Sequence, residues 1–511
     1  MEGMPVAVWT DPANPGVNRE FEVYAGFDKN HDGDLNISTN PESNEAFRCI
    51  NMTIVKVKIH NDINPSWGEA EDSDDVLCIG DIDVNGNIIT PAKIFYSILP
   101  QDLQPVSKTI MIRSEGSDIR MINTFEQGEK KAYEWDGKSS DGTYNEKEIY
   151  DIELEVLLPP DLRSVSDTYQ IIDLGVRHKP NLYIHPTEFS PPIDVSFALV
   201  NAEIWENQAK IADPPGDIDT LLTSYDNTDY YLKLPEEKQR DTTGASKAVY
   251  IREKTENLSG KTYVFCQYWM YYSISTLPID IDDPKDPDAT TDNVRCHGGD
   301  WEMAMVVVEL NPEGEDPEEK YIPFGVFCSA HYYGVSLNWY ALPPGTSGWC
   351  GEDYVNKSNN HPNLQIAAGA HATYFSQRLY DPFKRTWSGG SEAGMYDTQP
   401  FHGSFNDGIY TNNNPSDIDP GDLVKDIPVG EYPLKPIEKV AIWKGRWGSK
   451  LPNWTPFSSL GPESPMFRND DNDLSPQSLW SDLKSLFNKY RKPQSYECYG
   501  YVFSVITQPI P

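Results

Sequence analysis

The most informative part of the chain is Cys296-His297-Gly298-Gly299-Asp300-Trp301-Glu302-Met303-Ala304-Met305-Val306-Val307-Val308-Glu309-Leu310. Its second half is an apolar run that predicts a buried β-strand. Side chains at positions i and i+2 of a strand point to the same face, so Asp300 and Glu302 should project together, with Trp301 turned the other way. Neighbouring carboxylates repel unless a cation or a shared proton relieves them. The alternative is a strand end whose acids are solvated.

Composition limits the classes of function. The 511 residues include 42 Lys and Arg against 79 Asp and Glu, a net charge of −37. This argues against nucleic acid as a partner and fits an extracellular or cell-surface protein, or one that binds divalent cations. No apolar run reaches the ~18 residues that a membrane span requires. We expect any export signal to be absent or already removed. The oligomeric state is left open.

The fold is predicted to be mainly β. Tyr, Trp, Pro, Asn and Asp are frequent, which favours strands joined by turns. Residues 1–160 are predicted as an Ig-like antiparallel β-sandwich, because short β-prone runs alternate there with turn signals. The segment Glu134-Trp135-Asp136-Gly137-Lys138-Ser139-Ser140-Asp141-Gly142-Thr143-Tyr144 resembles Ig-like modules of the flagellar hook-capping type. A linker over 161–175 and a larger β-sandwich domain with a few peripheral helices over 176–511 should follow.

The N-terminal region contains a candidate calcium loop. Oxygen-bearing side chains recur at alternate positions around a central glycine, as in calcium loops, at Asp28, Asn30, Asp32, Asp34 and Asn36. The twelfth position is Thr39 and not the Glu of an EF-hand. The alternative is a plain turn, which the same residue types favour.

Several further residues are candidates for the same site as the two acids. His185, His331 and His371 each follow a β-prone run, and His371 is flanked by small residues that would leave room for a metal or substrate. A histidine at a strand end is more often structural than a ligand. Arg446 could clamp an anionic substrate or simply pair with an acid.

Five motifs occur in the order found in one known family. They are Tyr183-Ile184-His185-Pro186-Thr187-Glu188, Tyr268-Trp269-Met270-Tyr271-Tyr272, His297-Gly298-Gly299-Asp300-Trp301-Glu302, Ala368-Gly369-Ala370-His371-Ala372-Thr373-Tyr374 and Gly445-Arg446-Trp447-Gly448. The region from about 175 to 505 resembles the vacuolar protein sorting-associated protein 62 family. Gly298 stands where that family usually has an acid. The resemblance implies a domain type and no particular reaction.

The core His297-x-x-Asp300-Trp301-Glu302 also resembles the heptapeptide of the necrosis- and ethylene-inducing proteins. Those secreted β-sandwich cytolysins bind a divalent cation through acids of that motif and act on plant membranes. The resemblance implies that Asp300 and Glu302 are cation ligands, with His297 a ligand or a supporting group. Gly299 replaces one histidine of that pattern.

Two hypotheses of function follow. In the first, a Ca²⁺ or Mg²⁺ ion, or Zn²⁺ if histidines join, is held by His297, Asp300 and Glu302 in a metal-dependent hydrolase of phosphoesters or glycans. His331 or His371 would be the general base, and His185 and Trp301 would contact substrate. In the second, a non-catalytic or toxin-like module binds a glycan or lipid headgroup. A structural surface protein with cation-stabilised loops is a third alternative.

Overall fold

The structure is a computed structural model. It describes residues 21–25, 48–52, 56–60, 77–88, 92–99, 107–123, 131–157, 165–184, 191–275, 297–311, 314, 317–330, 333–340, 355, 357–366, 371, 373–375, 425–427, 431–450, 460–470, 477–483 and 486. The predicted calcium loop, together with His185 and His331, lies outside these residues.

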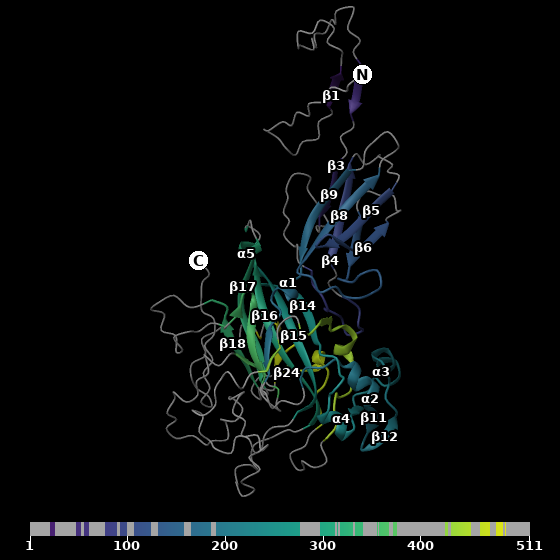
Figure 1. Ribbon diagram of the computed structural model, residues 1–511, viewed down its shortest axis with the longest axis vertical. Helices are drawn as coiled ribbons and strands as arrows, with labels where there is room; N and C mark the ends of the chain where they lie inside the picture. The colour runs from purple at the N-terminus through teal and green to yellow at the C-terminus, as the bar shows by residue number, and fades with distance from the viewer. Residues whose placement is uncertain are drawn as a thin grey trace, which may run out of the picture. The chain divides into compact units, whose positions relative to one another are not determined.

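The chain divides into two compact units. The first comprises Met1–Asp75, Ala92–Thr143 and Ile149–Ile172, and the second comprises Val76–Pro91, Tyr144–Glu148 and Asp173–Pro511. Strands dominate both units, so the predicted mainly β fold is confirmed (Figure 1).

The first unit is built from antiparallel sheets. Its strands are β1 (Phe21–Ala25), β2 (Arg48–Met52), β3 (Lys56–His60), β4 (Ala92–Leu99), β5 (Ser107–Ser114), β6 (Ser117–Asn123), β7 (Lys131–Trp135), β8 (Ile149–Leu157) and β9 (Val165–Ile172). The sheets β3-β4-β7 and β6-β5-β8-β9 face each other, because β3 contacts β8 and β9. In β8, Ile152, Leu154 and Val156 are buried while the residues between them are half-buried, which is the period expected of a strand with one core face. The Ig-like assignment of this sandwich stays a prediction.

The domain limits differ from those predicted. Strand β9 occupies most of the expected linker and pairs with β8 from Val165↔Val156 to Ile172↔Ile149. The first domain was predicted to end at residue 160, but its sheet continues beyond that point. Polar residues in the middle of β9, such as Ser166 and Asp167, hid its strand character from the apolar pattern.

The second unit contains most of the remaining elements. These are α1 (Leu174–Arg177), β10 (Asn181–Ile184), α2 (Ser196–Asn201), β11 (Glu203–Glu206), β12 (Ala209–Ala212), α3 (Ile218–Ser224), β13 (Tyr231–Lys233), α4 (Glu236–Arg240), β14 (Val249–Leu258), β15 (Lys261–Ser275), β16 (His297–Leu310), α5 (Pro317–Lys320), β17 (Tyr321–Ala330), β18 (Tyr333–Asn338), β19 (Lys357–Ser358), β20 (His361–Ile366), β21 (Thr373–Phe375), β22 (Lys425–Ile427), β23 (Leu434–Pro436), η8 (Glu438–Ile442), η10 (Pro465–Phe467), β24 (Asn469–Asp470) and β25 (Gln477–Ser478). In the described part of the chain, no helix is long and apolar enough to cross a membrane.

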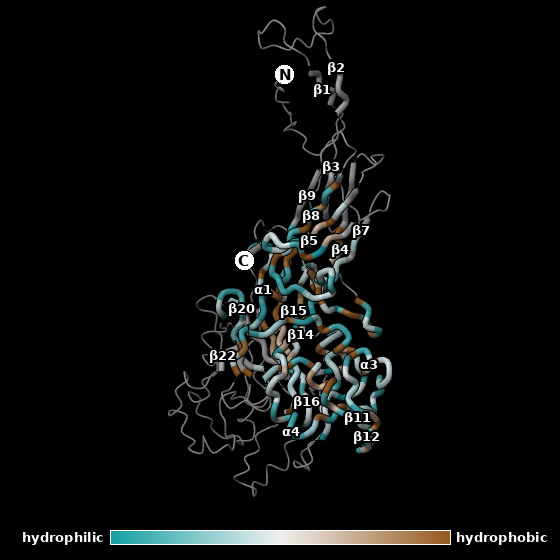
Figure 2. The backbone as a smooth tube through the Cα atoms, turned by 45° about the vertical axis from the view of Figure 1, so that its right-hand side comes forward, coloured by the Kyte–Doolittle hydropathy of each residue, from teal (hydrophilic) through white to brown (hydrophobic). Residues whose placement is uncertain are grey.

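A six-stranded sheet in the order β18-β17-β16-β15-β14-β23 is the centre of the second unit. Its middle strands β15 and β16 are buried almost from end to end, and hydrophobic segments gather around β14 and β15 in Figure 2. On one face, Trp269, Tyr271 and Trp301 belong to a core that also takes in residues of α2, α3 and η8. The helices α2 and α3 lie to the right of the sheet in Figure 1.

A second sheet covers part of the opposite face. It has the order β19-β20-β10-β22, and β21 also pairs with β20. Strand β21 contacts β16 and β17 of the large sheet. The residues at the start of β16 that face away from the Trp301 core therefore lie close to β21 and to the segment before it.

Two buried carboxyl groups lie near α1. Asp173 caps this helix, because Oδ1 accepts a hydrogen bond from the Val176 N–H at 2.8 Å and Oδ2 accepts one from the Tyr144 hydroxyl at 2.6 Å. Glu253 of β14 accepts a hydrogen bond from the Gly175 N–H at 2.7 Å. Burial raises the pKa of Asp173 to about 7 despite these bonds. Burial also raises the pKa of Glu253, and the nearby charge of Asp173 adds to that effect.

Asp173→Asn should flatten the dependence of stability on pH. The folded pKa of about 7 lies above the ordinary value of 3.8, so the folded state binds the extra proton between these values. The contribution of Asp173 to stability is therefore greatest below the ordinary pKa and is lost as pH rises through about 7. Asparagine keeps the capping acceptor and cannot ionise. We expect the loss of Tm between about pH 5 and about pH 8 to shrink in thermal denaturation.

The matched control is Asp217→Asn. Asp217 caps α3 through a 2.7 Å bond from the Thr220 N–H, but its carboxylate is exposed to solvent. This variant should keep the pH dependence of the wild type. An Asp173→Asn protein whose Tm falls with pH as steeply as that of the wild type would contradict the assignment.

Candidate functional site

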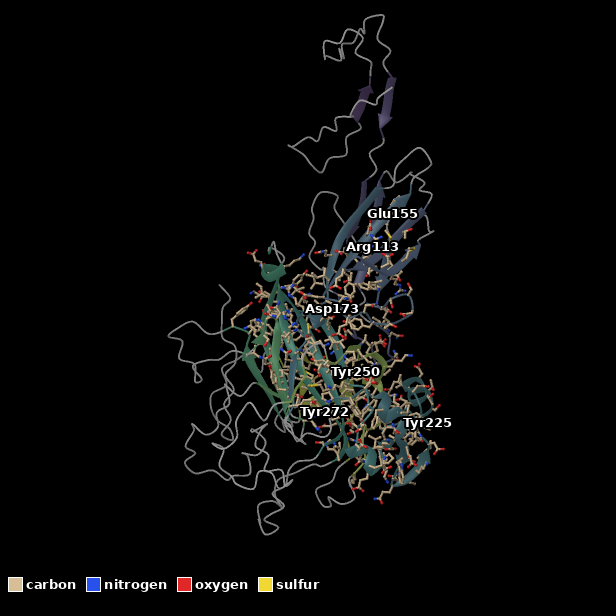
Figure 3. All side chains as sticks on the ribbon, in the orientation of Figure 1. Arg113, Glu155, Asp173, Tyr225, Tyr250 and Tyr272 are labelled. Carbon is tan, nitrogen blue, oxygen red and sulfur yellow. The ribbon has the colours of Figure 1, made fainter. Side chains whose placement is uncertain are left out.

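The start of β16 carries the two acids on one face. Asp300 lies opposite Tyr272 of β15, and Glu302 lies opposite Met270, in the antiparallel register. Only 3% of Asp300 and 1% of Glu302 is exposed to solvent. Tyr272, labelled in Figure 3, belongs to the same part of the large sheet. The structure thus makes these acids a buried pair and not the solvated strand end that was the alternative.

Arg468, which follows η10, lies beside both acids and offsets part of their negative charge. Its Nη1 lies 3.6 Å from Asp300 Oδ1, and its Nη2 lies 3.5 Å from Glu302 Oε1. Nη1 also donates a hydrogen bond to the Trp301 carbonyl between the two acids. A planar guanidinium suits this arrangement, because its N–H groups point in several fixed directions.

His371 adds a second contact to Asp300. Its Nδ1 lies 3.6 Å from Asp300 Oδ2, and its ring stacks on Tyr272 with centroids 4.0 Å apart. His371 has a φ of 59° and is fully buried. Burial alone would raise the pKa of Asp300, but His371, His297 and Arg468 together lower it below its ordinary value. Asp300 is therefore ionised at neutral pH.

Glu302 is held by the neighbouring strand β17. The Ser329 hydroxyl donates a hydrogen bond to Glu302 Oε2 at 2.6 Å and accepts one from the Met303 N–H at 2.8 Å. This chain of bonds fixes both ends of the carboxylate, with Ser329 on one oxygen and Arg468 on the other. The acid is thus positioned by groups from two other segments.

His297 stands at the edge of this group. Its Nδ1 lies 2.6 Å from the Gly299 carbonyl, and its backbone bridges to Lys450. Burial lowers the pKa of His297, although the charge of Asp300 acts in the opposite direction. The imidazole is therefore held near the acids mainly in its neutral form.

Three glycines allow two segments to cross the start of β16. A Cβ on Gly299, whose φ is 63°, would lie 1.9 Å from the Trp447 carbonyl oxygen. A Cβ on Gly448 would lie 1.4 Å from the Gly298 carbonyl oxygen, and one on Gly461 would lie 2.5 Å from it. Backbone occupies the space that the missing histidine at position 299 would need. The departure from the necrosis-protein pattern at this position therefore has a steric cause.

Two other predicted site residues lie elsewhere. Trp301 was expected to contact substrate, but its side chain is fully buried in the core, where the alternation of the strand places it. Arg446 was a candidate clamp for an anionic substrate, but its Nη2 pairs with Glu463 Oε1 at 2.9 Å. Its Nη1 donates to the Gly461 carbonyl at 3.1 Å. The structure thus matches the alternative role of Arg446, pairing with an acid.

Of the residues predicted to bind a metal, the structure describes His297, Asp300 and Glu302, and these three do not form a metal centre with other described residues. Nowhere in the ranges that the structure describes are three or more His, Cys, Asp or Glu arranged to hold an ion. Asp300 and Glu302 direct one oxygen each at Arg468, whose guanidinium occupies the place between them where a metal would lie and supplies one positive charge. The donor set does not fit a divalent ion in this arrangement.

Sequence reasoning missed Arg468 and Ser329. Ser329 was detectable in principle, because it is a polar residue at the end of the apolar run Phe324–Cys328 on β17. Arg468 gives no such signal, since it lies in a polar segment 166 positions after Glu302. Only the folded chain brings it to the acids.

No protein-family model and no curated protein matches the chain significantly. Solved structures that match are necrosis- and ethylene-inducing proteins. Protein 2 of this type, from the causal agent of cocoa's witches' broom disease, has 18% identity, with 40% of this chain and 67% of that chain covered and a TM-score of 0.19. The non-toxic HaNLP3 protein has 16% identity, 40% and 67% coverage and a TM-score of 0.21.

NLPPya in complex with glucosamine has 16% identity, with 40% of this chain and 66% of that chain covered and a TM-score of 0.20. This chain thus spans about two thirds of the length of these neighbours. With TM-scores this low, the similarity fixes neither the fold nor the function of this chain. The resemblance to the vacuolar protein sorting-associated protein 62 family stays a prediction from the motifs.

Gly299→Ala should be far more destabilising than an alanine at another glycine with positive φ. Gly216 has a φ of 84° and open space around it. Gly216→Ala should therefore lower the free energy of unfolding by only roughly 1–2 kcal/mol, the cost of a left-handed backbone for alanine. Gly299→Ala adds a clash with the Trp447 carbonyl, and we expect a total loss of at least about 3 kcal/mol. Denaturant unfolding measures both values. Equal losses in the two variants would contradict the close backbone contact.

Proposed function

We propose that this chain is a secreted, non-catalytic module that binds the sugar headgroup of a membrane lipid at the start of β16. One observation carries the proposal: two buried carboxylates of the His297–Glu302 motif are held rigidly on one face by Arg468, His371 and Ser329. Such a fixed array of charged acceptors and donors is typical of polar ligand recognition.

The outer members of the site supply the contacts for a ligand. Arg468 keeps 18% of its side chain exposed, and His297 is half-buried. A guanidinium offers several N–H donors, and a neutral imidazole offers one donor and one acceptor. Sugar hydroxyls both donate and accept hydrogen bonds, so they complement this rim. The buried acids keep the rim residues in place.

A hydrolase has less support from the same residues. A general base must come within hydrogen-bond reach of the proton that it removes. His371 is fully buried and stacked on Tyr272, which leaves it supporting Asp300. Each described acid directs one oxygen at Arg468 and the other at His371 or Ser329, which leaves neither acid in the role of a base for water. The geometry therefore favours binding over turnover.

Amino sugars are the natural first probes. NLPPya has been solved with glucosamine and with mannosamine. Their ammonium group would add a charge attraction to the acidic protein, whose net charge is −37. A neutral sugar with the same hydroxyls, such as glucose, separates that general attraction from recognition of the ring.

Replacing both acids should weaken the binding of sugar-bearing membranes. We compare the wild type with Asp300→Asn plus Glu302→Gln in co-sedimentation with phosphatidylcholine vesicles, with and without a glycosylated sphingolipid. Losing the support of two charged hydrogen bonds should reduce affinity by tenfold or more, as each contributes roughly 1.5–3 kcal/mol. Circular dichroism checks that the variant is folded.

The matched control is Glu203→Gln, which removes a carboxylate of β11 that pairs with Lys210 of β12, away from this network. It should bind like the wild type. Equal binding by the double variant, or equal binding to plain vesicles, would refute the proposal. If ligand-observed NMR shows binding of free glucosamine or glucose while the vesicles do not bind, the result would support sugar recognition and refute a membrane lipid as the ligand.

A further inference from the structure

The acids at the start of β16 need a positive charge that the fold must supply. Asp300 and Glu302 are almost fully buried and lie on the same face of one strand. Removing two like charges from water is costly unless each is paired and hydrogen-bonded. A divalent ion is one solution, and an internal cation is the other.

Arg468 is built into the chain as that internal cation. Its guanidinium spans Asp300, Glu302 and the carbonyl of the residue between them. Its backbone is fixed on both sides, because its N–H donates to the Pro465 carbonyl at 3.3 Å and its carbonyl accepts from the Leu479 N–H at 3.1 Å. The segment is thus anchored where the guanidinium reaches both acids.

The other carboxylate contacts come from a backbone N–H, an imidazole and a hydroxyl of the chain. Asp300 Oδ1 also accepts a hydrogen bond from the Trp301 N–H at 2.8 Å, and Oδ2 faces His371. Glu302 Oε2 accepts from Ser329. Each of the four oxygens therefore has a partner among the described residues. The position of Gly299, where a side chain could have added a ligand, is filled by the Trp447 backbone.

We propose that Arg468 is a tethered counter-ion that takes the place of a divalent metal, so that this site is complete without one. The inference concerns how the acids are neutralised and does not depend on which ligand the module binds. It disagrees with the metal centre that the sequence motif implies. It also predicts that the capacity to bind a metal is latent and is released when the guanidinium is removed.

Terbium luminescence tests this directly. Tb³⁺ replaces Ca²⁺ at oxygen sites, and excited Tyr or Trp side chains nearby sensitise its emission. Tyr272 lies opposite Asp300 on the neighbouring strand, and Trp301 lies between the two acids in the sequence, so an ion held there would be sensitised. Other acidic segments of the full chain can also bind Tb³⁺. The informative signal is therefore the part of the emission that disappears with Asp300→Asn plus Glu302→Gln.

In the wild type we expect no emission that depends on the two acids. In Arg468→Gln, acid-dependent emission should appear, and millimolar Mg²⁺ or Ca²⁺ should raise Tm through preferential binding to the folded state. Arg446→Gln is the matched control, because it removes an arginine that pairs with a single carboxylate, Glu463. It should gain neither signal. Arg468→Lys, which keeps a cation, should gain much less than Arg468→Gln.

Two results would overturn the inference. The first is acid-dependent Tb³⁺ emission in the wild type, which would mean that the acids already hold a metal. The second is a folded Arg468→Gln that gains no such emission. If Arg468→Gln does not fold, the wild-type comparison still decides, together with Arg468→Lys. If the wild-type site holds no metal but the protein does not bind sugar, the proposed function would be refuted and the inference about Arg468 would stand.

Discussion

The contact of backbone with backbone at Gly298, Gly448 and Gly461 is the constraint on which the rest of the site depends. Gly298 N–H donates to the Ser449 carbonyl at 2.8 Å, and Gly461 N–H donates to the Gly448 carbonyl at 2.9 Å. Three segments can approach this closely only where side chains are absent. The contact fixes the C-terminal part of the described chain against the start of β16.

That contact carries consequences for both faces of the sheet. On the core face, Trp447 packs edge-on against Trp301 with ring centroids 5.6 Å apart. The Tyr271 hydroxyl donates to the Trp447 carbonyl at 3.3 Å on the same side. On the other face, the chain that continues past Gly461 delivers Arg468 to the acids. One backbone crossing therefore aligns the aromatic core and the charged site together.

The sequence predicted the parts of the site that depend on local geometry. Strand alternation correctly separates the two acids from Trp301, because that follows from a period of two alone. Proximity of His371 to Asp300 was a hypothesis from a recurring context, and the structure brings these two together. The partner of the acids could not be predicted. Arg468 reaches the acids through contacts between segments that are far apart in the sequence. Neither residue spacing nor composition predicts such contacts.

The domain limits show the same division between local and long-range information. The strands of the first unit follow from alternation, as β8 does. By contrast, Val76–Pro91 and Tyr144–Glu148 lie within the N-terminal sequence but belong to the second unit. Cys78 illustrates this, because its Sγ lies 3.2 Å from Thr255 Oγ1 on β14. Secondary-structure propensities describe local conformation, so they do not predict that these short segments pack with a sheet far along the sequence.

Buried acids of the second unit are stabilised in different ways. Asp81 forms a buried ion pair with Arg252 at 2.6 Å, and that arginine stacks over Trp480. Among the residues that the structure describes, no arginine pairs with Asp173 or Glu253, and burial raises the pKa of both acids, which favours their protonated forms.

Asp300 and Glu302 instead share Arg468. In a chain with 42 basic and 79 acidic residues, bases are outnumbered by acids, so the positions of Arg252 and Arg468 matter. Arg252 contacts the Trp480 carbonyl from β14, while Arg468 reaches β16 from the C-terminal side. Both arginines therefore join the same late segment of the chain to the central sheet. The charge that neutralises each acid also fixes where that segment lies, which ties the electrostatics of the site to the stability of the fold.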